Sequence, residues 1–249
     1  MQTYRTSEIA KQTGLHPNTI RFYEQIGFLT KPVRLPNGYR VYTALHLEQV
    51  RFIRLALRAE VLQNGLREAA VAIVRLCAAC SFEEALQGTN RYIEQIDREI
   101  AFAQGAIRAV EDMLSRTKLP DSPPKKRRDA ADALGVTQET LRNWERNGLV
   151  LIHRLPNGYR MYTAEDMERL LIIRTLRCAN YSLSAILRLT GKLSQSREIH
   201  VLDALNTPGK NEEIVSVCDH LLTALACARE DAQEMIARID RMKQITTLQ

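Results

Sequence analysis

The amino-acid sequence predicts a mainly α-helical protein with two similar helix-turn-helix domains, each containing a β-hairpin and followed by a long coiled-coil helix. The first observation behind this prediction is a repeat. The heptapeptide RLPNGYR occurs at residues 34–40 and again at 154–160, inside longer matching segments. The second is that apolar residues with heptad spacing follow each copy. A period of about 120 residues is too long for a solenoid unit and fits a whole small domain.

The first copy begins with two short helices. Residues 7–13 are predicted to form the first helix, with Ser7 as its N-cap and Gly14 ending it. Pro17 favours the first turn of a helix, so the second helix is expected over residues 17–26. The apolar side chains of these two helices can close a small helix-turn-helix core.

A β-hairpin and three helices complete the first half. The dipeptide Asn37-Gly38 is typical of a two-residue hairpin turn, and residues 39–43 are predicted to form the returning strand. Helix resumes near Ala44, and another helix covers residues 66–80. Apolar residues then recur alternately three and four apart, which predicts a coiled-coil seam about 32 Å long. The residues of this first seam are Ile93, Ile96, Ile100, Ala103, Ile107, Val110 and Leu114.

The second half repeats this order after a linker. The segment PDSPPKKRR contains three prolines, which predict an extended chain. RRDAADALG then matches SEIAKQTG, and helix resumes at about Ala164 after the second hairpin. Pro208-Gly209 precedes a second seam, about 42 Å long. The residues of this second seam are Ile214, Cys218, Leu221, Leu225, Ala228, Ala232, Met235, Ile239 and Met242.

The formal net charge of +6 is concentrated in the repeated segments. Residues 1–58 contain nine Lys and Arg against three Asp and Glu, and residues 124–178 contain eleven against seven. The rest of the chain is acidic. This distribution is typical of modules that bind nucleic acid, and solvated helix faces are the alternative interpretation.

Several classes of protein are disfavoured by the sequence. No apolar run is long enough to cross a bilayer, and the first residues lack a signal-peptide core, so we expect a cytoplasmic protein that is not in the membrane. Five cysteines without scaffold spacing fit a reducing compartment. No zinc-ligand spacing, P-loop or nucleophile elbow is present. We therefore expect neither an enzyme nor a protein with a cofactor or metal.

Two linked motifs occur in the same order in both copies. The first is TIRFYE at 19–24 and TLRNWE at 140–145, and the second is GYRVY at 38–42 and GYRMY at 158–162. In these motifs the chain resembles the MerR family of bacterial transcription regulators. The resemblance implies two winged helix-turn-helix domains that bind duplex promoter DNA, with RNA polymerase at the promoter as a second partner. It does not identify an effector, and the effector-binding domain of larger members is absent from this sequence.

The resemblance, together with the chemistry of base recognition, predicts the DNA-binding residues. The first residues of a recognition helix meet base edges in the major groove, where Asn and Gln pair with adenine and Arg with guanine or phosphate. In the family, the wing and the aromatic position of the helix position the duplex, although core packing is the alternative for Tyr23 and Trp144. The predicted DNA-binding residues are His16, Asn18, Thr19, Arg21, Tyr23, Arg40 and Tyr42 in the first copy, and Thr137, Gln138, Thr140, Arg142, Trp144, Arg160 and Tyr162 in the second.

The resemblance also predicts how the two copies are arranged. Family members are homodimers joined by antiparallel long helices, and fusing two protomers would give the connectivity of this chain. We therefore expect an intrachain pseudo-dimer, with a homodimer of four DNA-binding domains as the alternative. The expected segments are a first winged domain at 1–80, a first coiled-coil helix at 81–117, a basic linker at 118–127, a second winged domain at 128–195 and a second coiled-coil region at 196–249.

Three features of the sequence each allow two interpretations. Cys77 and Cys80 form a CxxC that suggests metal or redox sensing, but their position on an apolar helix face favours core packing. The basic run at 125–128 is either a solvated linker or an added phosphate contact. Finally, because the two recognition helices differ, the chain either reads an operator that is not a perfect palindrome, or has lost DNA binding in one copy and sequesters a protein partner.

Overall fold

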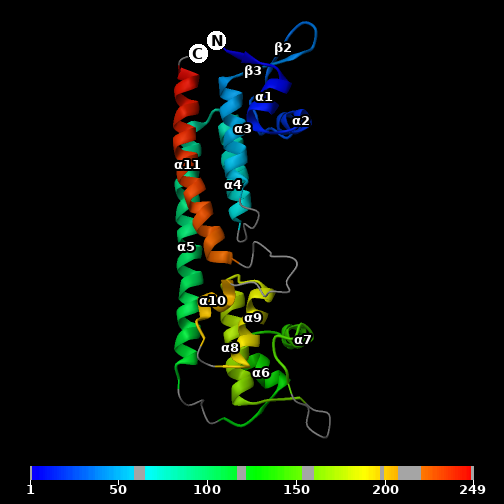
Figure 1. Cartoon of the computed structure of the whole chain (residues 1–249), viewed down its shortest axis with the longest axis vertical. Helices are drawn as coiled ribbons and strands as arrows, with labels where there is room; N and C mark the ends of the chain where they lie inside the picture. The colour runs from blue at the N-terminus through cyan, green and yellow to red at the C-terminus, as the bar shows by residue number, and fades with distance from the viewer. Residues whose placement is uncertain are drawn as a thin grey trace. The chain divides into compact units, whose positions relative to one another are not determined.

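The computed structural model describes residues 2–58, 65–116, 122–152, 160–196, 199–206 and 220–247. The chain divides into two compact units, the first comprising Met1–Arg98 with Ala224–Gln249 and the second Glu99–Thr223. Most of the described residues are helical, so the predicted mainly α-helical fold is confirmed (Figure 1). The long helix α5, Phe82–Leu114, contributes its first part to the first unit and its last part to the second.

The first unit opens with a helix-turn-helix. Strand β1, Thr3–Tyr4, precedes helix α1, Thr6–Thr13, and helix α2, Pro17–Gln25. The predicted N-cap Ser7 is wrong, because α1 begins one residue earlier and the Glu8 carboxylate reaches back to accept a hydrogen bond from the Arg5 backbone N–H at 2.6 Å. Gly14 ends α1 as predicted, in the left-handed conformation (φ +65°) that glycine adopts without steric cost.

The wing of the first unit is a hairpin with a different turn from the predicted one. Strands β2, Val33–Arg34, and β3, Arg40–Thr43, pair antiparallel, and β3 also pairs with β1. The Leu35 N–H donates to the Tyr39 carbonyl at 2.9 Å, and the Gly38 N–H donates to the Leu35 carbonyl at 2.8 Å. Pro36 and Asn37 thus form the centre of a three-residue loop, with Gly38 following at φ +80°. Proline fixes its own φ at about −65°, which favours this loop over the two-residue Asn37-Gly38 turn.

Two helices complete the first winged domain. They are α3, Ala44–Ala56, and α4, Leu66–Ala78, and both confirm predicted helices. The second ends before Cys80, because Cys80 has φ +59°, which a right-handed helix cannot include. The buried apolar side chains of α3 form the centre of the core: Leu45, Leu47, Val50, Phe52, Ile53, Leu55 and Ala56.

The seam of α5 begins earlier than predicted. In the first unit the buried positions of this helix are spaced alternately three and four apart: Phe82, Ala85, Thr89, Tyr92 and Ile96. The predicted seam residues Ile93 and Ile100 are only half-buried. Thr89 and Tyr92 were not part of the predicted seam, because that pattern was based on aliphatic residues alone. The Thr89 hydroxyl can be buried because it donates to the Ala85 carbonyl at 2.8 Å.

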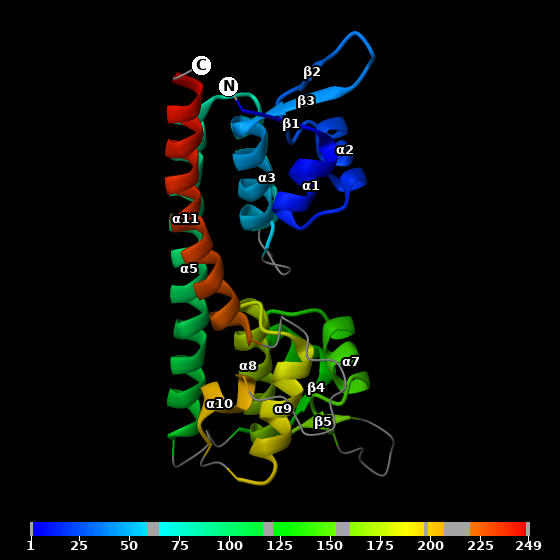
Figure 2. The same ribbon diagram turned by 45° about the horizontal axis from the view of Figure 1, so that its top comes forward.

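Helix α11, Leu221–Thr247, runs antiparallel to α5 in the first unit (Figures 1 and 2). Two ion pairs join the helices in this orientation, Arg229 with Asp97 at 2.6 Å and Lys243 with Glu83. The predicted second seam is confirmed from Leu221 onward, since all its residues there are buried. Ile214, Cys218 and Pro208-Gly209 lie outside the described residues.

The second unit repeats the helix-turn-helix. Its elements are β4, Lys125–Lys126, α6, Arg127–Leu134, α7, Gln138–Arg146, β5, Met161–Tyr162, α8, Ala164–Cys178, α9, Leu183–Leu193, and α10, Val201–Asn206. Gly135 ends α6 with φ +62°, matching Gly14 in the first unit. The second heptapeptide, up to residue 159, residue 117 of the predicted first coiled-coil helix and residues 118–121 of the predicted linker lie outside the described residues.

Two features of the second unit differ from expectation. The basic run at 125–128 is not a linker, because Lys125 and Lys126 form β4, which pairs with β5, and Arg127 begins α6. The region predicted as a second coiled coil also contains the separate short helix α10. The last part of α5 packs in this unit, where the Tyr181 hydroxyl donates to the Ala103 carbonyl at 3.5 Å. None of the described helices in either unit is long and apolar enough to span a membrane.

Candidate nucleic-acid interface

The N-caps of both predicted recognition helices are side chains from the predicted site. At the start of α2, His16 Nδ1 accepts a hydrogen bond from the Asn18 backbone N–H at 3.2 Å. At the start of α7, Thr137 Oγ1 accepts from the Thr140 backbone N–H at 3.0 Å. These caps satisfy N–H groups that a helix leaves unpaired. His16 and Thr137 therefore shape the ends of the helices as well as lying where a base contact is expected.

The exposed faces of α2 and α7 differ in charge. In α2 the Arg21 guanidinium donates to the Asn18 side-chain carbonyl at 3.0 Å, and both side chains are exposed. In α7 the residue that corresponds to Asn18 is Glu139, which pairs with Arg142 at 3.1 Å and with Arg146 at 3.2 Å. The other predicted contacts on these helices are exposed or half-exposed: Thr19, Gln138 and Thr140.

A carboxylate that sequence reasoning missed joins α2 to the wing of the first unit. Glu24 pairs with Arg40 Nε at 2.5 Å and with Arg34 at 3.3 Å. Glu24 is the last residue of the motif TIRFYE, and it is largely buried. Arg40, a predicted DNA contact, is thus held against α2 by an ion pair.

The second unit has the same arrangement with one more partner. Glu145, which corresponds to Glu24, pairs with Arg160 at 3.2 Å and with Arg127 at 3.1 Å. The Tyr162 hydroxyl donates to Glu145 at 2.5 Å and accepts from Arg127 at 3.2 Å. Burial and the hydrogen bond to Glu145 raise the pKa of Tyr162. We call these four residues the Glu145 cluster; it ties the wing strand β5 to α6 and α7.

The two wing tyrosines do not face outward. Tyr42 and Tyr162 are fully buried, so their predicted direct contact with DNA is wrong, and they support the wing from within. The Tyr42 hydroxyl lies near Thr6, the position that Arg127 occupies in the second unit, but has no hydrogen bond of standard geometry among the described residues. Burial raises the pKa of Tyr42.

The aromatic position of the recognition helix is mainly structural. Trp144 is buried, which confirms the core-packing interpretation for this residue. Tyr23 is half-buried, with its ring centroid 6.4 Å from that of Phe22 and 6.2 Å from that of Phe28. Burial raises the pKa of Tyr23 despite the opposing effect of Arg54. Tyr23 therefore keeps an accessible edge, whereas Trp144 does not.

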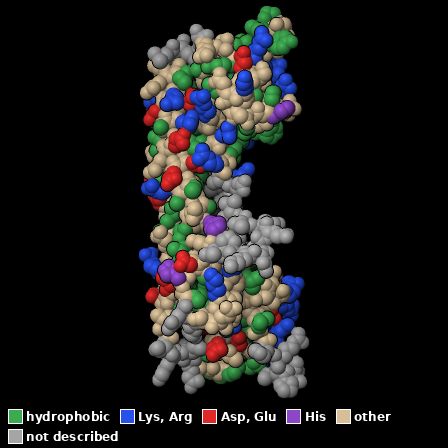
Figure 3. Space-filling view, viewed as in Figure 1, with side chains coloured by type: hydrophobic (Ala, Val, Ile, Leu, Met, Phe, Trp, Pro, Cys, Tyr) green, Lys and Arg blue, Asp and Glu red, His purple; other side chains and the backbone are tan. Residues whose placement is uncertain are grey.

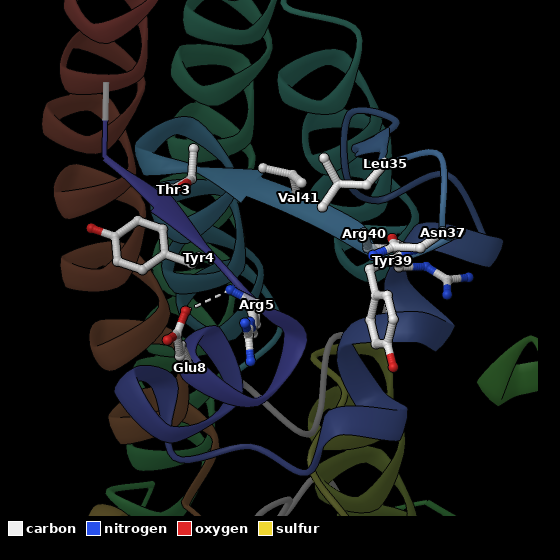
Figure 4. A pocket seen from close by; sticks show the side chains of 9 residues that line it. All are labelled: Thr3, Tyr4, Arg5, Glu8, Leu35, Asn37, Tyr39, Arg40 and Val41. Carbon is white, nitrogen blue, oxygen red and sulfur yellow. Dashed lines mark hydrogen bonds between the residues drawn. The ribbon is translucent and has the colours of Figure 1, made fainter.

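The surface around the first wing is open and basic. A pocket of about 550 Å³ lies between β1, the start of α1 and the wing loop, with Arg5 and Tyr39 on its rim (Figure 4). The Tyr39 ring projects away from the strand and is exposed (Figure 4). Lys and Arg side chains gather over α2 and the wing in the first unit, and over α7 in the second (Figure 3).

The CxxC cysteines pack as part of the fold. Cys77 is buried, and burial raises the pKa of its thiol to about 12. Cys80 Sγ lies 3.8 Å from the Thr30 hydroxyl, which donates to the Ala78 carbonyl at 2.7 Å. Within the described part of the chain, no group of three or more His, Cys, Asp or Glu is placed to hold a metal ion.

The structure defines a protein with two helix-turn-helix units, and comparisons with protein families agree with this class. Residues 5–42 match the MerR family regulatory protein model, and residues 126–192 match the MerR HTH family regulatory protein model. Both segments are therefore similar to the MerR family of helix-turn-helix regulators, in agreement with the resemblance predicted from the motifs.

Individual relatives match mainly over one such segment. The HTH-type transcriptional regulator CueR of Yersinia pestis is 45% identical over 62 residues, which are 25% of this chain and 45% of that protein. ZntR of Escherichia coli (strain K12) is 37% identical over 65 residues, 26% of this chain and 46% of that protein. This chain thus spans less than half the length of either.

Two further similarities are more distant. The mercuric resistance operon regulatory protein of Bacillus cereus is 27% identical over 113 residues, which are 45% of this chain and 84% of that protein. Among solved structures, the crystal structure of HiNmlR, a MerR family regulator lacking the sensor domain, bound to promoter DNA, is 18% identical. The match covers 55% of this chain and 95% of that chain, with a TM-score of 0.25.

Proposed function

We propose that this chain is a transcriptional regulator that binds duplex DNA sequence-specifically, with α2 and α7 as two unlike recognition helices. The observation that carries the proposal is the matched pair of exposed arginines, Arg21 and Arg142, each one turn from the start of its helix. In both units a largely buried glutamate, Glu24 or Glu145, holds the wing arginine beside that helix. Such an arrangement presents arginine to base edges with a second cation close to the phosphates.

The operator expected for these helices is not a perfect palindrome. The residues at the start of α2 are His16, Pro17 and Asn18, whereas α7 begins with Thr137, Gln138 and Glu139. Helices with different side chains at the positions that meet base edges should prefer different half-sites. RNA polymerase at the same promoter is the expected protein partner by family resemblance, and an effector is not assigned.

We also propose that one chain takes the place of a dimer, with domains close to the segments predicted from the sequence. The composition of the two units supports this. The first winged domain packs with α11, which comes from the second half of the chain, and the second packs with the end of α5, which comes from the first half. The buried Glu48 of α3 pairs with Arg238 of α11 at 3.2 Å, and Arg58 pairs with Asp231 at 2.8 Å. Light scattering should give the mass of one chain, 28.4 kDa, and a mass of two chains would contradict the proposal.

DNA binding is tested by mobility shift on the promoter of the protein's own gene. Arg21→Ala and Arg142→Ala should each weaken specific binding by about 1–3 kcal/mol if the arginine reads a base. A phosphate contact should instead weaken binding to all sequences and lower the salt slope by about one. The control is Arg91→Ala, an exposed arginine on α5. Unchanged affinity in both variants, or no salt-dependent binding by the wild type, would favour a protein-interaction module instead.

A further inference from the structure

One exposed carboxylate distinguishes the second recognition helix from the first. Glu139 is the second residue of α7, and its side chain is 62% exposed. One carboxylate oxygen pairs with Arg142, which is 57% exposed, and the other pairs with Arg146, which is 71% exposed. These residues line a depression of about 370 Å³ together with Arg160 and Glu145. The carboxylate therefore lies among the arginines that would face DNA.

The first helix has no such charge. The corresponding residues are Asn18 for Glu139 and Gln25 for Arg146, and Asn18 leaves the charge of Arg21 uncompensated. Ion pairs between exposed side chains are weak, so their contribution to the stability of α7 is small. Their effect on an anionic ligand is larger, because a carboxylate beside the arginines cancels part of the attraction to phosphate.

We infer that Glu139 determines the specificity of the second recognition helix by accepting a hydrogen bond from a cytosine amino group in the major groove. This inference rests on the proposed DNA-binding function. A carboxylate only accepts hydrogen bonds, so it is repelled by the acceptor atoms of guanine and by the O4 atom of thymine. Adenine offers an amino group, but its own N7 and the O4 of the paired thymine flank that group on both sides, whereas the cytosine amino group has an acceptor, the O6 of the paired guanine, on one side only.

The same carboxylate lowers binding to DNA of arbitrary sequence. With no cytosine opposite it, Glu139 stays paired with Arg142 and Arg146 and keeps them from the phosphates. The second unit then binds strongly only where the base contact is made. Glu139 therefore lowers the affinity for random-sequence DNA and strengthens the preference of the second unit at one base pair.

The test replaces Glu139 with the residue of the first copy, Glu139→Asn, and measures binding of the full chain to two kinds of duplex. On random-sequence DNA near 0.15 M salt, release of one or two arginines should raise the affinity about five- to thirty-fold and steepen the salt slope by about one to two. On a promoter library with each base pair varied, the wild type should favour cytosine at one position at least about fivefold, and the variant should lose that preference. Glu230→Gln, an exposed site on α11, is the control for net charge.

The outcomes separate this inference from the proposed function. Promoter binding by both proteins with the same salt slope and the same base preferences would overturn the role of Glu139 and leave the regulator intact. A gain in random-sequence affinity without a change at any base would also contradict the cytosine contact. If the wild type binds neither DNA, the proposed function fails first.

Discussion

The substitution Glu145→Gln should destabilise the second unit far more than a comparable change elsewhere on the same helix. The Glu145 side chain is 9% exposed and interacts with two arginines and the hydroxyl of Tyr162. Glutamine has nearly the same shape, so it removes the charge while leaving little cavity. Arg127, which is 18% exposed, would then lose its negatively charged partner and keep only neutral acceptors, the Tyr162 hydroxyl and the glutamine carbonyl.

The expected loss follows from the burial of each partner. Removing one member of a fully buried ion pair costs about 3–5 kcal/mol, because the other charge is left uncompensated. Arg160 is 32% exposed and can be solvated, which reduces that figure. We therefore expect the free energy of unfolding to fall by about 2–3 kcal/mol.

The assay is urea unfolding followed by tryptophan fluorescence. Trp144 is the only tryptophan in the sequence, is 5% exposed and precedes Glu145 in α7, so its emission reports on this unit. The matched control is Glu139→Gln, an exposed carboxylate on the same helix, which should cost less than about 1 kcal/mol. If Glu145→Gln is no more destabilising than Glu139→Gln, the cluster does not hold the wing to the recognition helix.

Two further predictions concern buried titratable groups. Because burial raises the pKa of Cys77 to about 12, a thiol reagent at pH 8 should label the exposed Cys178 and Cys227 within minutes and Cys77 only after unfolding; rapid labelling of Cys77 would show that its packing is wrong. Burial and Asp231 raise the pKa of Tyr92 to about 12 from 10.0, so the protonated form stabilises the fold fully below pH 10, and this stabilisation is lost as the pH rises through 12. Urea unfolding followed by circular dichroism should therefore show a smaller decrease in the free energy of unfolding between pH 9 and pH 11.5 for Tyr92→Phe than for the wild type, by about 2 kcal/mol. An equal decrease in both proteins would contradict the raised pKa of Tyr92.

Local chemistry explains which elements could be predicted from the sequence. Pro17 and Gly14 act through their own backbone preferences, and the helix boundaries at these residues agree with expectation. The hairpin turn was mispredicted because Pro36, not the Asn37-Gly38 pair, decides its type. In each case where one residue dominates the local conformation, the sequence is sufficient once that residue is identified.

The buried residues of the candidate site could not be predicted from the sequence, because their positions depend on contacts between distant segments of the chain. Tyr42 and Tyr162 belong to a motif that implied contact with DNA, yet their burial depends on how the wing packs against α1 and α2, or α6 and α7. Glu24 and Glu145 had a visible signal, since a glutamate ends the helix motif in both copies. Their role needed the fold, because their partners Arg40 and Arg160 lie 16 and 15 residues further along the chain.

The sequence differences between the two copies have a functional explanation if one chain takes the place of a dimer. In a homodimer any substitution appears in both subunits, so a carboxylate at the recognition position would face both half-sites. Two domains encoded in one chain can change separately, and here they have: Asn18 corresponds to Glu139, and Thr6 to Arg127. The second of these changes adds a cation to the Glu145 cluster beside the helix that carries Glu139. A recognition helix with weaker attraction to phosphate depends more on correct base contacts, and those contacts require the helix and wing to be held in fixed geometry. Arg127 in the Glu145 cluster and Glu139 on the exposed face of α7 are therefore consistent with one another. Both are features expected of a domain that binds more selectively than the first copy.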